Sequence, residues 1–286
     1  MDNHDKSTSS TVIEVSENIA VNAVQPNAPP VTMASKRAAE AEPGCPRKFK
    51  APRKAYIYGN YDRYYGYRNM HETPREDVRL QAFIEQKHLI QAKRLLDIGC
   101  NNGSLTLEIA RHCKPTSVVG IDIDGDLIAS ARRHLIHMIK TSSKEECAET
   151  EHLSSVQFRK ANYVYEDESL LDNEKPQFDV ILCLSVTKWI HLNFGDKAMK
   201  LVFRRVYRQL HPGGVFILEA QPWSSYKRRK KLTEQILANF NQITFKPDNF
   251  NAYLLGDDVG FREVSELKVS DHTVKGFRRP IFVFRK

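Results

Sequence analysis

The residues best suited to chemistry are two aspartates that end apolar runs. Asp97 ends the first run and is followed by a turn on Gly99 and Gly103, after which a helical pattern begins. Asp122 ends the next run, Val118-Val-Gly-Ile-Asp122. Glycines at a strand-to-helix turn let the backbone approach a ligand, and an acid after the second strand accepts ribose hydroxyl hydrogens. The pair predicts a nucleoside site on a doubly wound sheet.

The spacing of the glycines indicates which nucleoside the site holds. The turn is G-x-x-x-G, whereas dinucleotide binders carry G-x-G-x-x-G, so the sequence specifies no pyrophosphate cradle. This favours S-adenosylmethionine (SAM), which has no phosphate, over a nicotinamide cofactor. The alternative interpretation is an ordinary βαβ turn with surface carboxylates.

Two further strand ends add polar side chains to the same edge of the sheet. Asn162 follows the third run and could read the adenine edge, or could simply stabilise a turn. Lys188 and Trp189 follow the fourth run. They predict a phosphate-binding cation beside a base-stacking ring, unless they are an exposed lysine and a core tryptophan.

Positive charge recurs beside aromatic residues. The chain has a net charge of +8, and Lys227–Lys231 is a run of five cations before a predicted helix. That run opposes the helix dipole, so local stability does not account for it. Lys275-Gly-Phe-Arg-Arg279 repeats the pattern. Interleaved rings and cations predict binding of single-stranded RNA, with a solvated surface as the alternative. The RNA contacts expected here are Trp189, Lys227, Arg228, Lys230, Phe277 and Arg279.

Composition narrows the class of protein. The five cysteines include no C-x-x-C pair, so neither a disulfide framework nor a zinc site is expected, and no other metal cluster is indicated. No apolar stretch approaches the ~20 residues of a membrane span, and no signal peptide is evident. We expect no membrane association and no secretion. The basic N-terminal region favours a nuclear location for the protein, and the alternative is the cytoplasm.

Strands that alternate with helices must position these residues. The 286 residues divide into a disordered, basic-ended tail, 1–53, and one folded domain, 54–286. The pattern predicts a mostly parallel α/β sheet covered on both faces. Strands are expected at 94–98, 117–121, 156–160, 178–184, 215–219, 264–269 and 279–285, and helices at 75–88, 104–111, 125–138, 195–210 and 232–243.

Four segments together resemble the bicoid-interacting family of methyltransferases. They are 58–68, rich in tyrosine, 96–101 (Leu-Asp-Ile-Gly-Cys-Asn), 182–191, containing Thr-Lys-Trp, and 219–226. The resemblance covers nearly all of the folded region. It implies a seven-stranded, Rossmann-like class I fold and SAM-dependent methylation of the 5′ γ-phosphate of a small non-coding RNA such as 7SK or U6. Proteins of a ribonucleoprotein are candidate partners.

The resemblance also assigns site residues. Tyr64, Arg68 and Lys188 would hold the RNA end and serve catalysis. This chain differs from the large vertebrate member of the family in having a shorter insertion after the second acidic strand and a brief N-terminal extension. With the aspartates and glycines above included, the residues expected to line the cofactor are Tyr65, Arg79, Asp97, Gly99, Cys100, Asn101, Gly103, Asp122, Ile123, Asn162, Tyr163 and Leu184.

Two rival functions are consistent with the same fold. One is a catalytically inactive RNA-binding protein that uses the fold as a platform, but the intact turn and both aspartates argue against loss of the pocket. The other is a methyltransferase acting on a base or a protein side chain. Such enzymes often carry an Asn/Asp-Pro-Pro-aromatic turn after the fourth strand, where this chain has Leu184-Ser-Val-Thr-Lys188.

Overall fold

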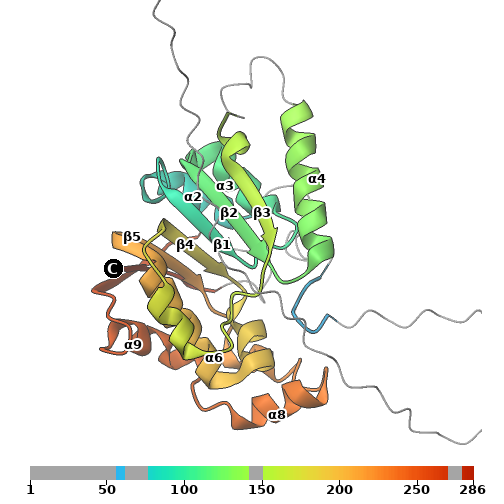
Figure 1. Ribbon diagram of the computed structural model, residues 1–286, viewed down its shortest axis with the longest axis vertical. Coiled ribbons are helices and arrows are strands. Elements are labelled where there is room, and N and C mark those ends of the chain that lie inside the picture. Colours follow the sequence, from blue (N-terminus) through green and yellow to red (C-terminus); the bar gives the residue numbers. More distant parts are fainter. Residues whose placement is uncertain (1–55, 62–76, 142–150, 270–278) are drawn as a thin grey trace, which may run out of the picture. The chain divides into compact units, whose positions relative to one another are not determined.

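A twisted seven-stranded sheet forms the centre of the computed structural model, which describes residues 56–61, 77–141, 151–269 and 279–286 (Figure 1). The strand order is β3-β2-β1-β4-β5-β7-β6. All neighbouring pairs from β3 to β5 are parallel, whereas β7 is antiparallel to both β5 and β6. The strands are β1 (Arg94–Ile98), β2 (Ser117–Asp122), β3 (Val156–Lys160), β4 (Phe178–Leu184), β5 (Leu210–Glu219), β6 (Glu263–Leu267) and β7 (Ile281–Arg285).

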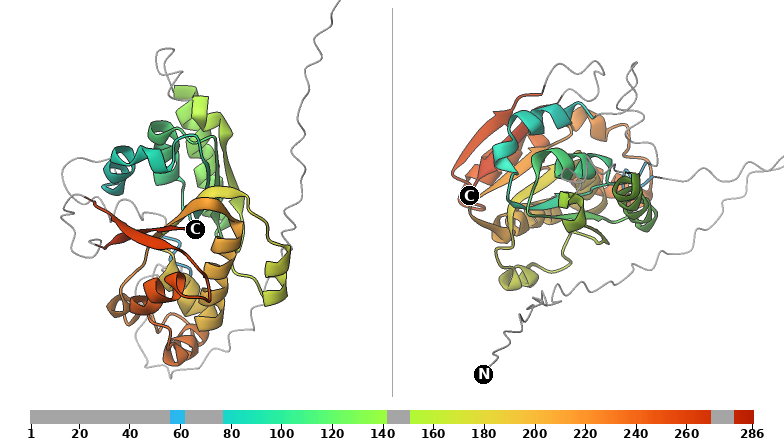
Figure 2. Two further views of the ribbon diagram at one scale, coloured as in Figure 1. Left: turned by 90° about the vertical axis from the view of Figure 1, so that its left-hand side faces the viewer. Right: turned by 90° about the horizontal axis from the view of Figure 1, so that it is seen from above.

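Helices cover both faces of this sheet, as the two views of Figure 2 show. Helices α2 (Arg79–Glu85), α3 (Ser104–Cys113) and α4 (Gly125–Thr141) pack on one face. Helices α6 (Thr187–Gln209) and α9 (Phe250–Leu255) pack on the other, and α8 (Glu234–Gln242) packs against α6. The remaining short elements are α7 (Trp223–Tyr226) and the 3-10 turns η1 (Lys87–Leu89), η2 (Glu151–Ser155), η3 (Glu168–Asn173) and η4 (Pro247–Asn249).

Alternation of side chains along each strand builds two separate cores. In β1, Leu95 belongs to the core beneath α2, α3 and α4, and its neighbour Leu96 belongs to the core beneath α6 and α9. In β4, Val180 and Ile181 divide in the same way. Successive strand residues point to opposite faces, so a sheet buried on both sides needs the near-continuous apolar runs that this chain has.

The sequence predicted the strands better than the helices. All seven strands form, and β1, β3 and β4 have the predicted limits. The predicted helix at 195–210 instead begins at Thr187 and is kinked at Gly195, where φ is 76° and ψ is −174°. Helix 232–243 is shorter, because Thr233 caps α8 by accepting a hydrogen bond from the backbone N–H of Ile236. Neither α7 nor α9 was predicted.

Two of the predicted segments fall wholly or partly outside the described residues. They are the N-terminal tail and the start of the helix expected at 75–88, of which Arg79–Glu85 is helical. Within the described ranges, no helix has the length and apolar character to cross a membrane. The same ranges contain no group of three or more His, Cys, Asp or Glu residues placed to hold a metal ion.

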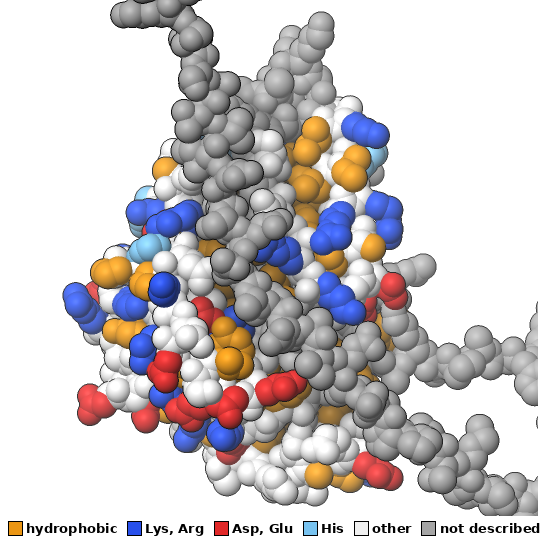
Figure 3. Space-filling view, viewed as in Figure 1, with side chains coloured by type: hydrophobic (Ala, Val, Ile, Leu, Met, Phe, Trp, Pro, Cys, Tyr) orange, Lys and Arg blue, Asp and Glu red, His pale blue; other side chains and the backbone are white. Residues whose placement is uncertain are grey.

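Charge is unevenly spread over the surface. On the face shown in Figure 3, Lys and Arg side chains lie over the upper part, including α4, while Asp and Glu side chains gather in the lower part. Helix α4 contributes Arg132, Arg133 and Lys140. The net positive charge of the chain therefore does not by itself locate a binding surface.

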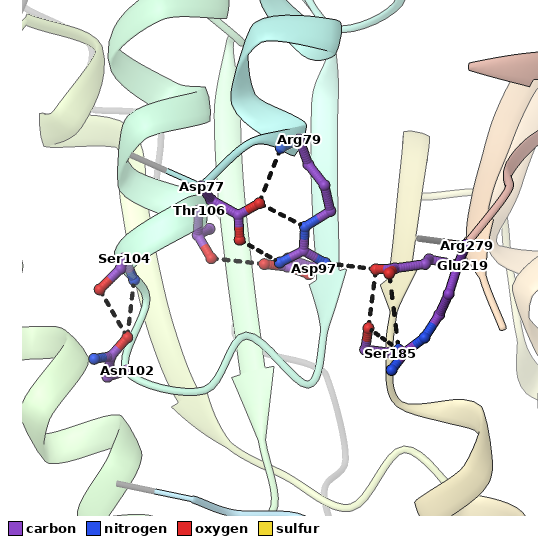
Figure 4. A network of polar contacts seen from close by, with 9 residues as sticks. All are labelled: Asp77, Arg79, Asp97, Asn102, Ser104, Thr106, Ser185, Glu219 and Arg279. Atoms are coloured by element: carbon purple, nitrogen blue, oxygen red, sulfur yellow. Dashed lines mark hydrogen bonds and ion pairs between the residues drawn. The ribbon is translucent and has the colours of Figure 1, made fainter. Parts of the chain in front are cut away.

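A buried cluster of ion pairs joins α2 to the end of β5 (Figure 4). Arg79 donates to Asp77 through Nε and Nη2, at 2.9 and 2.7 Å, and to Glu219 through Nη1 at 2.7 Å. The three side chains are 4% exposed or less. Glu219 also accepts a hydrogen bond from Ser185 at 2.9 Å and lies 3.8 Å from Arg279. The N-terminal helix, two strand ends and the segment before β7 therefore meet at one carboxylate.

Glu219→Gln should lower the free energy of unfolding by about 1.5–3 kcal/mol, because it weakens a buried charged hydrogen bond from Arg79, which keeps its pair with Asp77. Urea denaturation of the full chain measures this change. The matched control is Glu263→Gln, since Glu263 pairs with Arg285 at 2.8 Å on an exposed edge. That variant should change the free energy of unfolding by about 0–1 kcal/mol. Equal stability of the two variants would contradict the prediction.

Candidate active site

A cavity of about 930 Å³, counted with its open mouth, lies at the carboxyl ends of β1, β2 and β4. Strand order reverses between β1 and β4, and open α/β sheets bind ligands at such a point. Ten of the twelve residues expected at the cofactor line this cavity: Arg79, Asp97, Gly99, Cys100, Asn101, Asp122, Ile123, Asn162, Tyr163 and Leu184. Of the other two, Gly103 does not line it, and Tyr65 lies outside the described residues.

The two glycines of the turn have different functions. Gly99 has φ 74°, and a Cβ there would lie 2.4 Å from Val186, so the bare backbone shapes the cavity wall. Gly103 has φ 75° and precedes α3. A Cβ there would lie 2.6 Å from Phe158, in the core. The structure therefore corrects the expected cofactor contact of Gly103, because its close approach is to Phe158 and serves helix packing.

Asp122 reaches the cavity with acceptor capacity to spare. Its Oδ2 accepts from the backbone N–H of Asn101 at 3.0 Å, and its Oδ1 accepts from that of Asp124 at 2.9 Å. A carboxylate can accept about four hydrogen bonds, so these two leave room for hydroxyl donors. Burial raises the pKa of Asp122 above its usual value, against the effect of the two N–H groups.

Asp97 is held more tightly inside the protein. It is 5% exposed and accepts a hydrogen bond of 2.6 Å from the Thr106 hydroxyl. Burial raises the pKa of Asp97 to about 6, although the hydroxyl bond and the charge of Arg79 act in the opposite direction. Asp97 therefore fixes the end of β1 to α3 while its carboxyl group borders the cavity.

The third strand end has a more local structure than expected. Asn162 Oδ1 accepts from the backbone N–H of Val164 at 3.1 Å, which is the turn-stabilising alternative for this residue. The Tyr163 hydroxyl donates to Gln209 at 2.8 Å, and burial raises the pKa of Tyr163. Both residues still line the cavity. The side-chain oxygen of Asn162 is thus engaged in a turn, and the phenol of Tyr163 points away into the core.

Residues 56–61 form a cover over the cavity, hereafter the cover segment, and three of them line it: Tyr58, Gly59 and Asn60. Asn60 donates to Asp124 at 2.5 Å, and Asn193 donates to the backbone oxygen of Ile57 at 2.9 Å. The segment therefore bridges the end of β2 and helix α6. The tyrosine-rich composition set this stretch apart in the sequence, but it did not predict that residues 56–61 lie over the cavity.

Trp189 lies beneath the cover segment. It is 8% exposed and lines the cavity, and a Cβ on Gly59 would lie 2.0 Å from its indole nitrogen. Tyr61 contacts the ring edge-on, with 5.9 Å between centroids. The expectation of an open platform for stacking an RNA base is therefore corrected, because the protein itself occupies the surroundings of this ring.

Lys188 is a buried cation that does not itself line the cavity, but it lies beside Trp189, which does. Lys188 is 9% exposed, and its Nζ lies 4.6 Å from the Trp189 ring centroid. Within the described part of the chain it forms no ion pair with a carboxylate. Burial, followed by the positive charges of Arg279, Arg229 and Arg228, lowers the pKa of Lys188 to about 7. Such a cation becomes more stable when an anion binds beside it.

The other residues expected to contact RNA differ in their exposure, and three of them lie outside the described residues. Lys227 and Arg228 are exposed, and Lys230 is half-buried. Arg279 donates to the Ser185 hydroxyl at 2.9 Å, so it anchors the segment before β7 to the cavity wall. The candidates Tyr64, Arg68 and Phe277 lie outside the described residues.

Two functional residues were missed at the strand ends. Glu219 ends β5 as Asp97 and Asp122 end the runs of their strands, so its position was a signal. Ser185 follows β4 with φ 63°, a conformation that costs a non-glycine residue about 1–3 kcal/mol. Its backbone N–H donates to the carbonyl oxygen of Glu219 at 2.9 Å. No sequence pattern predicts this left-handed backbone conformation at a serine.

The chain is similar to several known methyltransferases. Residues 178–286 match the family of Bicoid-interacting protein 3 (Bin3), and residues 96–216 match a methyltransferase domain. The U6 snRNA methylphosphate capping enzyme Amus of Drosophila melanogaster is 49% identical over 231 residues, which cover 81% of this chain and 75% of that protein. The human 7SK snRNA methylphosphate capping enzyme is 38% identical over 283 residues, covering 83% of this chain and 40% of that protein.

A more distant relative is the RNA 5'-monophosphate methyltransferase of Homo sapiens, which is 24% identical over 168 residues and is matched over 54% of either chain. The similarity to the Drosophila and human capping enzymes extends over more than two thirds of this chain. The matched methyltransferase domain spans β1 to β4 and part of β5 of the sheet. The chain therefore belongs to the Bin3 family of methyltransferases.

Proposed function

We propose that the protein transfers a methyl group from SAM to the 5′ γ-phosphate of a small non-coding RNA such as 7SK or U6. The observation that carries the proposal is Lys188, a buried cation without a carboxylate partner among the described residues, beside the cavity of a methyltransferase. Arginines add further positive charge there. Relatives named as methylphosphate capping enzymes support the same substrate class.

The cavity residues fit the cofactor. When bound, SAM supplies a methyl group on a positively charged sulfur. Asp122 has acceptor capacity for the two ribose hydroxyls, and apolar walls such as Ile123 and Leu184 suit the adenine ring. Gly99 keeps the turn close to the ligand. Tyr65 is expected to complete this site.

The substrate needs positioning more than activation. The second pKa of a terminal phosphate is roughly 6, so its oxygen is already anionic at neutral pH and requires no general base. Lys188 would hold the phosphate oxygens by charge, with Arg68 and the Tyr64 hydroxyl as expected further donors. Orientation of the bound groups can then supply most of the rate enhancement.

The RNA 5'-monophosphate is the second candidate substrate, because a relative carries that activity in its name. The cluster of Lys188 with three arginines favours the more highly charged triphosphate end. We further propose a nuclear location, ribonucleoprotein partners, and the division into a 1–53 tail and a 54–286 methyltransferase domain. An RNA-binding protein without activity remains the contrasting hypothesis.

The function is tested by supplying methyl-labelled SAM with RNAs that carry a 5′ triphosphate, monophosphate or hydroxyl. We expect label on the triphosphate RNA, and we expect a pyrophosphohydrolase that cleaves the phosphoanhydride bonds of the 5′ end to release it. Label that stays on the triphosphate RNA after this cleavage would exclude the reaction. Absence of label together with calorimetric SAM binding would favour a cofactor-binding protein of other specificity.

Substitutions should separate the phosphate site from the cofactor site. Lys188→Ala should lower kcat/KM about 100-fold or more, because it removes a preorganised charge, while SAM affinity stays nearly unchanged. Asp122→Asn should instead weaken SAM binding about 10- to 100-fold, since charged hydrogen bonds to the ribose are lost. Calorimetry with SAM and initial rates measure the two effects. Equal loss of SAM affinity in both variants would contradict the assignment.

The pH profile should report Lys188. Its pKa is lowered to about 7, so the positive charge is present below that pH and is lost as the pH rises through it. The phosphate gains its second charge above roughly pH 6, so kcat/KM should be bell-shaped between these limits. The Lys188→Arg variant keeps its positive charge, so its kcat/KM should no longer fall on the alkaline side of the profile. An unchanged alkaline limb in that variant would assign it to another group.

A further inference from the structure

Four side chains beside α8 form a layered stack, hereafter the aromatic–lysine ridge. Trp223 and Phe240 are stacked with 4.9 Å between centroids and an interplanar angle of 2°. Lys230 lies over Phe240 at 4.9 Å from its centroid, and Lys246 lies over Trp223 at 5.9 Å. Both rings are half-buried, and Lys246 is exposed. Cations thus sit on both members of a parallel aromatic pair.

The ridge continues from the mouth of the cavity. Trp189, which lines the cavity, contacts Tyr61 at 5.9 Å between centroids, and Arg229 lies 5.5 Å over the Tyr61 ring. Arg229 is followed in sequence by Lys230, the first lysine of the ridge. Pairs of rings and pairs of cations therefore lead from the cavity to Lys246, with Arg229 and Lys230 joined as neighbours in the chain.

Packing explains only part of this arrangement. Trp223 and Phe240 pack against a small core of Leu192, Tyr226, Ile236 and Ile243. That contact accounts for the rings but not for the lysines, since an exposed cation–π contact contributes only about 0.5–1 kcal/mol. In the part of the chain that the structure describes, neither Lys230 nor Lys246 forms an ion pair with a carboxylate. Unpaired cations on aromatic faces suit a polyanion that also carries flat rings.

We propose that the aromatic–lysine ridge binds the nucleotides that follow the first two nucleotides at the 5′ end of the RNA. The inference rests on the proposed function for the direction of the chain, because the 5′ phosphate is placed at Lys188. Bases can stack on Trp223 and Phe240 where the lysine side chains give way, and the lysines then pair with the flanking phosphates. An acidic peptide would satisfy the lysines but offers no bases to stack on the rings, so single-stranded RNA is the better fit.

The test compares two substrates that share a 5′ triphosphate, a dinucleotide and an unstructured RNA of about 15 nucleotides, a length within the usual site size of single-strand binders. The variant is Lys246→Gln/Phe240→Leu in the full chain. For the long RNA we expect KM to rise about tenfold or more and the dependence of log Kd on log salt to fall by about 0.7. For the dinucleotide, KM and kcat should stay at the wild-type values.

The matched control is Lys175→Gln/Phe282→Leu. Lys175 is exposed and precedes β4, at the edge of the sheet opposite the cavity, and Phe282 is a half-buried ring on β7. This control should leave KM unchanged for both substrates. A ridge variant that behaves like the control on the long RNA would overturn the proposal, and so would an equal rise in KM for both substrates.

Direct binding keeps the two proposals separate. If wild-type protein transfers no methyl group to either RNA, yet the ridge variant still binds the long RNA about tenfold more weakly, the proposed reaction fails and the ridge stands. If the wild type methylates both RNAs and the ridge variant binds the long RNA with wild-type affinity, the reaction stands and the ridge is refuted. A refuted ridge would make an acidic protein segment the next occupant to test.

Discussion

The carboxylate of Glu219 is the constraint on which the rest of the site depends. It is fully buried and accepts from Arg79 at 2.7 Å and from the Ser185 hydroxyl at 2.9 Å. Burying charges costs several kcal/mol per ion unless their partners are well placed, so the cluster fixes the elements that carry them. Ser185, held with φ 63°, is thereby kept in place at the cavity wall. The same carboxylate positions Arg279 beside Lys188.

The sequence predicted the features that arise from local pattern. Apolar runs located the five parallel strands, because a sheet buried on both faces needs them, and alternation located β7 with β6 as its partner. Asp122 ends one of the apolar runs and lies at the cavity, as expected. The turn at Gly99 followed from its glycine spacing, and its positive φ confirms the expected backbone. The family assignment from four sequence segments was also confirmed, by relatives up to 49% identical.

The features that escaped prediction arise from contacts between distant parts of the chain. The cover segment reaches its position through Asn60, whose partner Asp124 is 64 residues away. Trp189 was expected to be open to RNA, but Gly59 lies against it, a contact separated by 130 positions in sequence. Gly103 looked like a ligand-binding glycine, yet its neighbour is Phe158. Spacing identifies a turn but does not say what the turn contacts.

Positive charge has two different physical forms in this protein. Lys188 is buried among other cations, so its charged state is costly until an anion arrives, and its lowered pKa records that cost. Lys227 and Lys246 are exposed to solvent. A buried cation is selective for its ligand, because it is stabilised only by a negatively charged group that can reach it. Solvated cations attract any polyanion, and salt screens that attraction. In the proposed reaction, the buried lysine would define the reacting end of the RNA, and the exposed lysines would hold the nucleotides behind it.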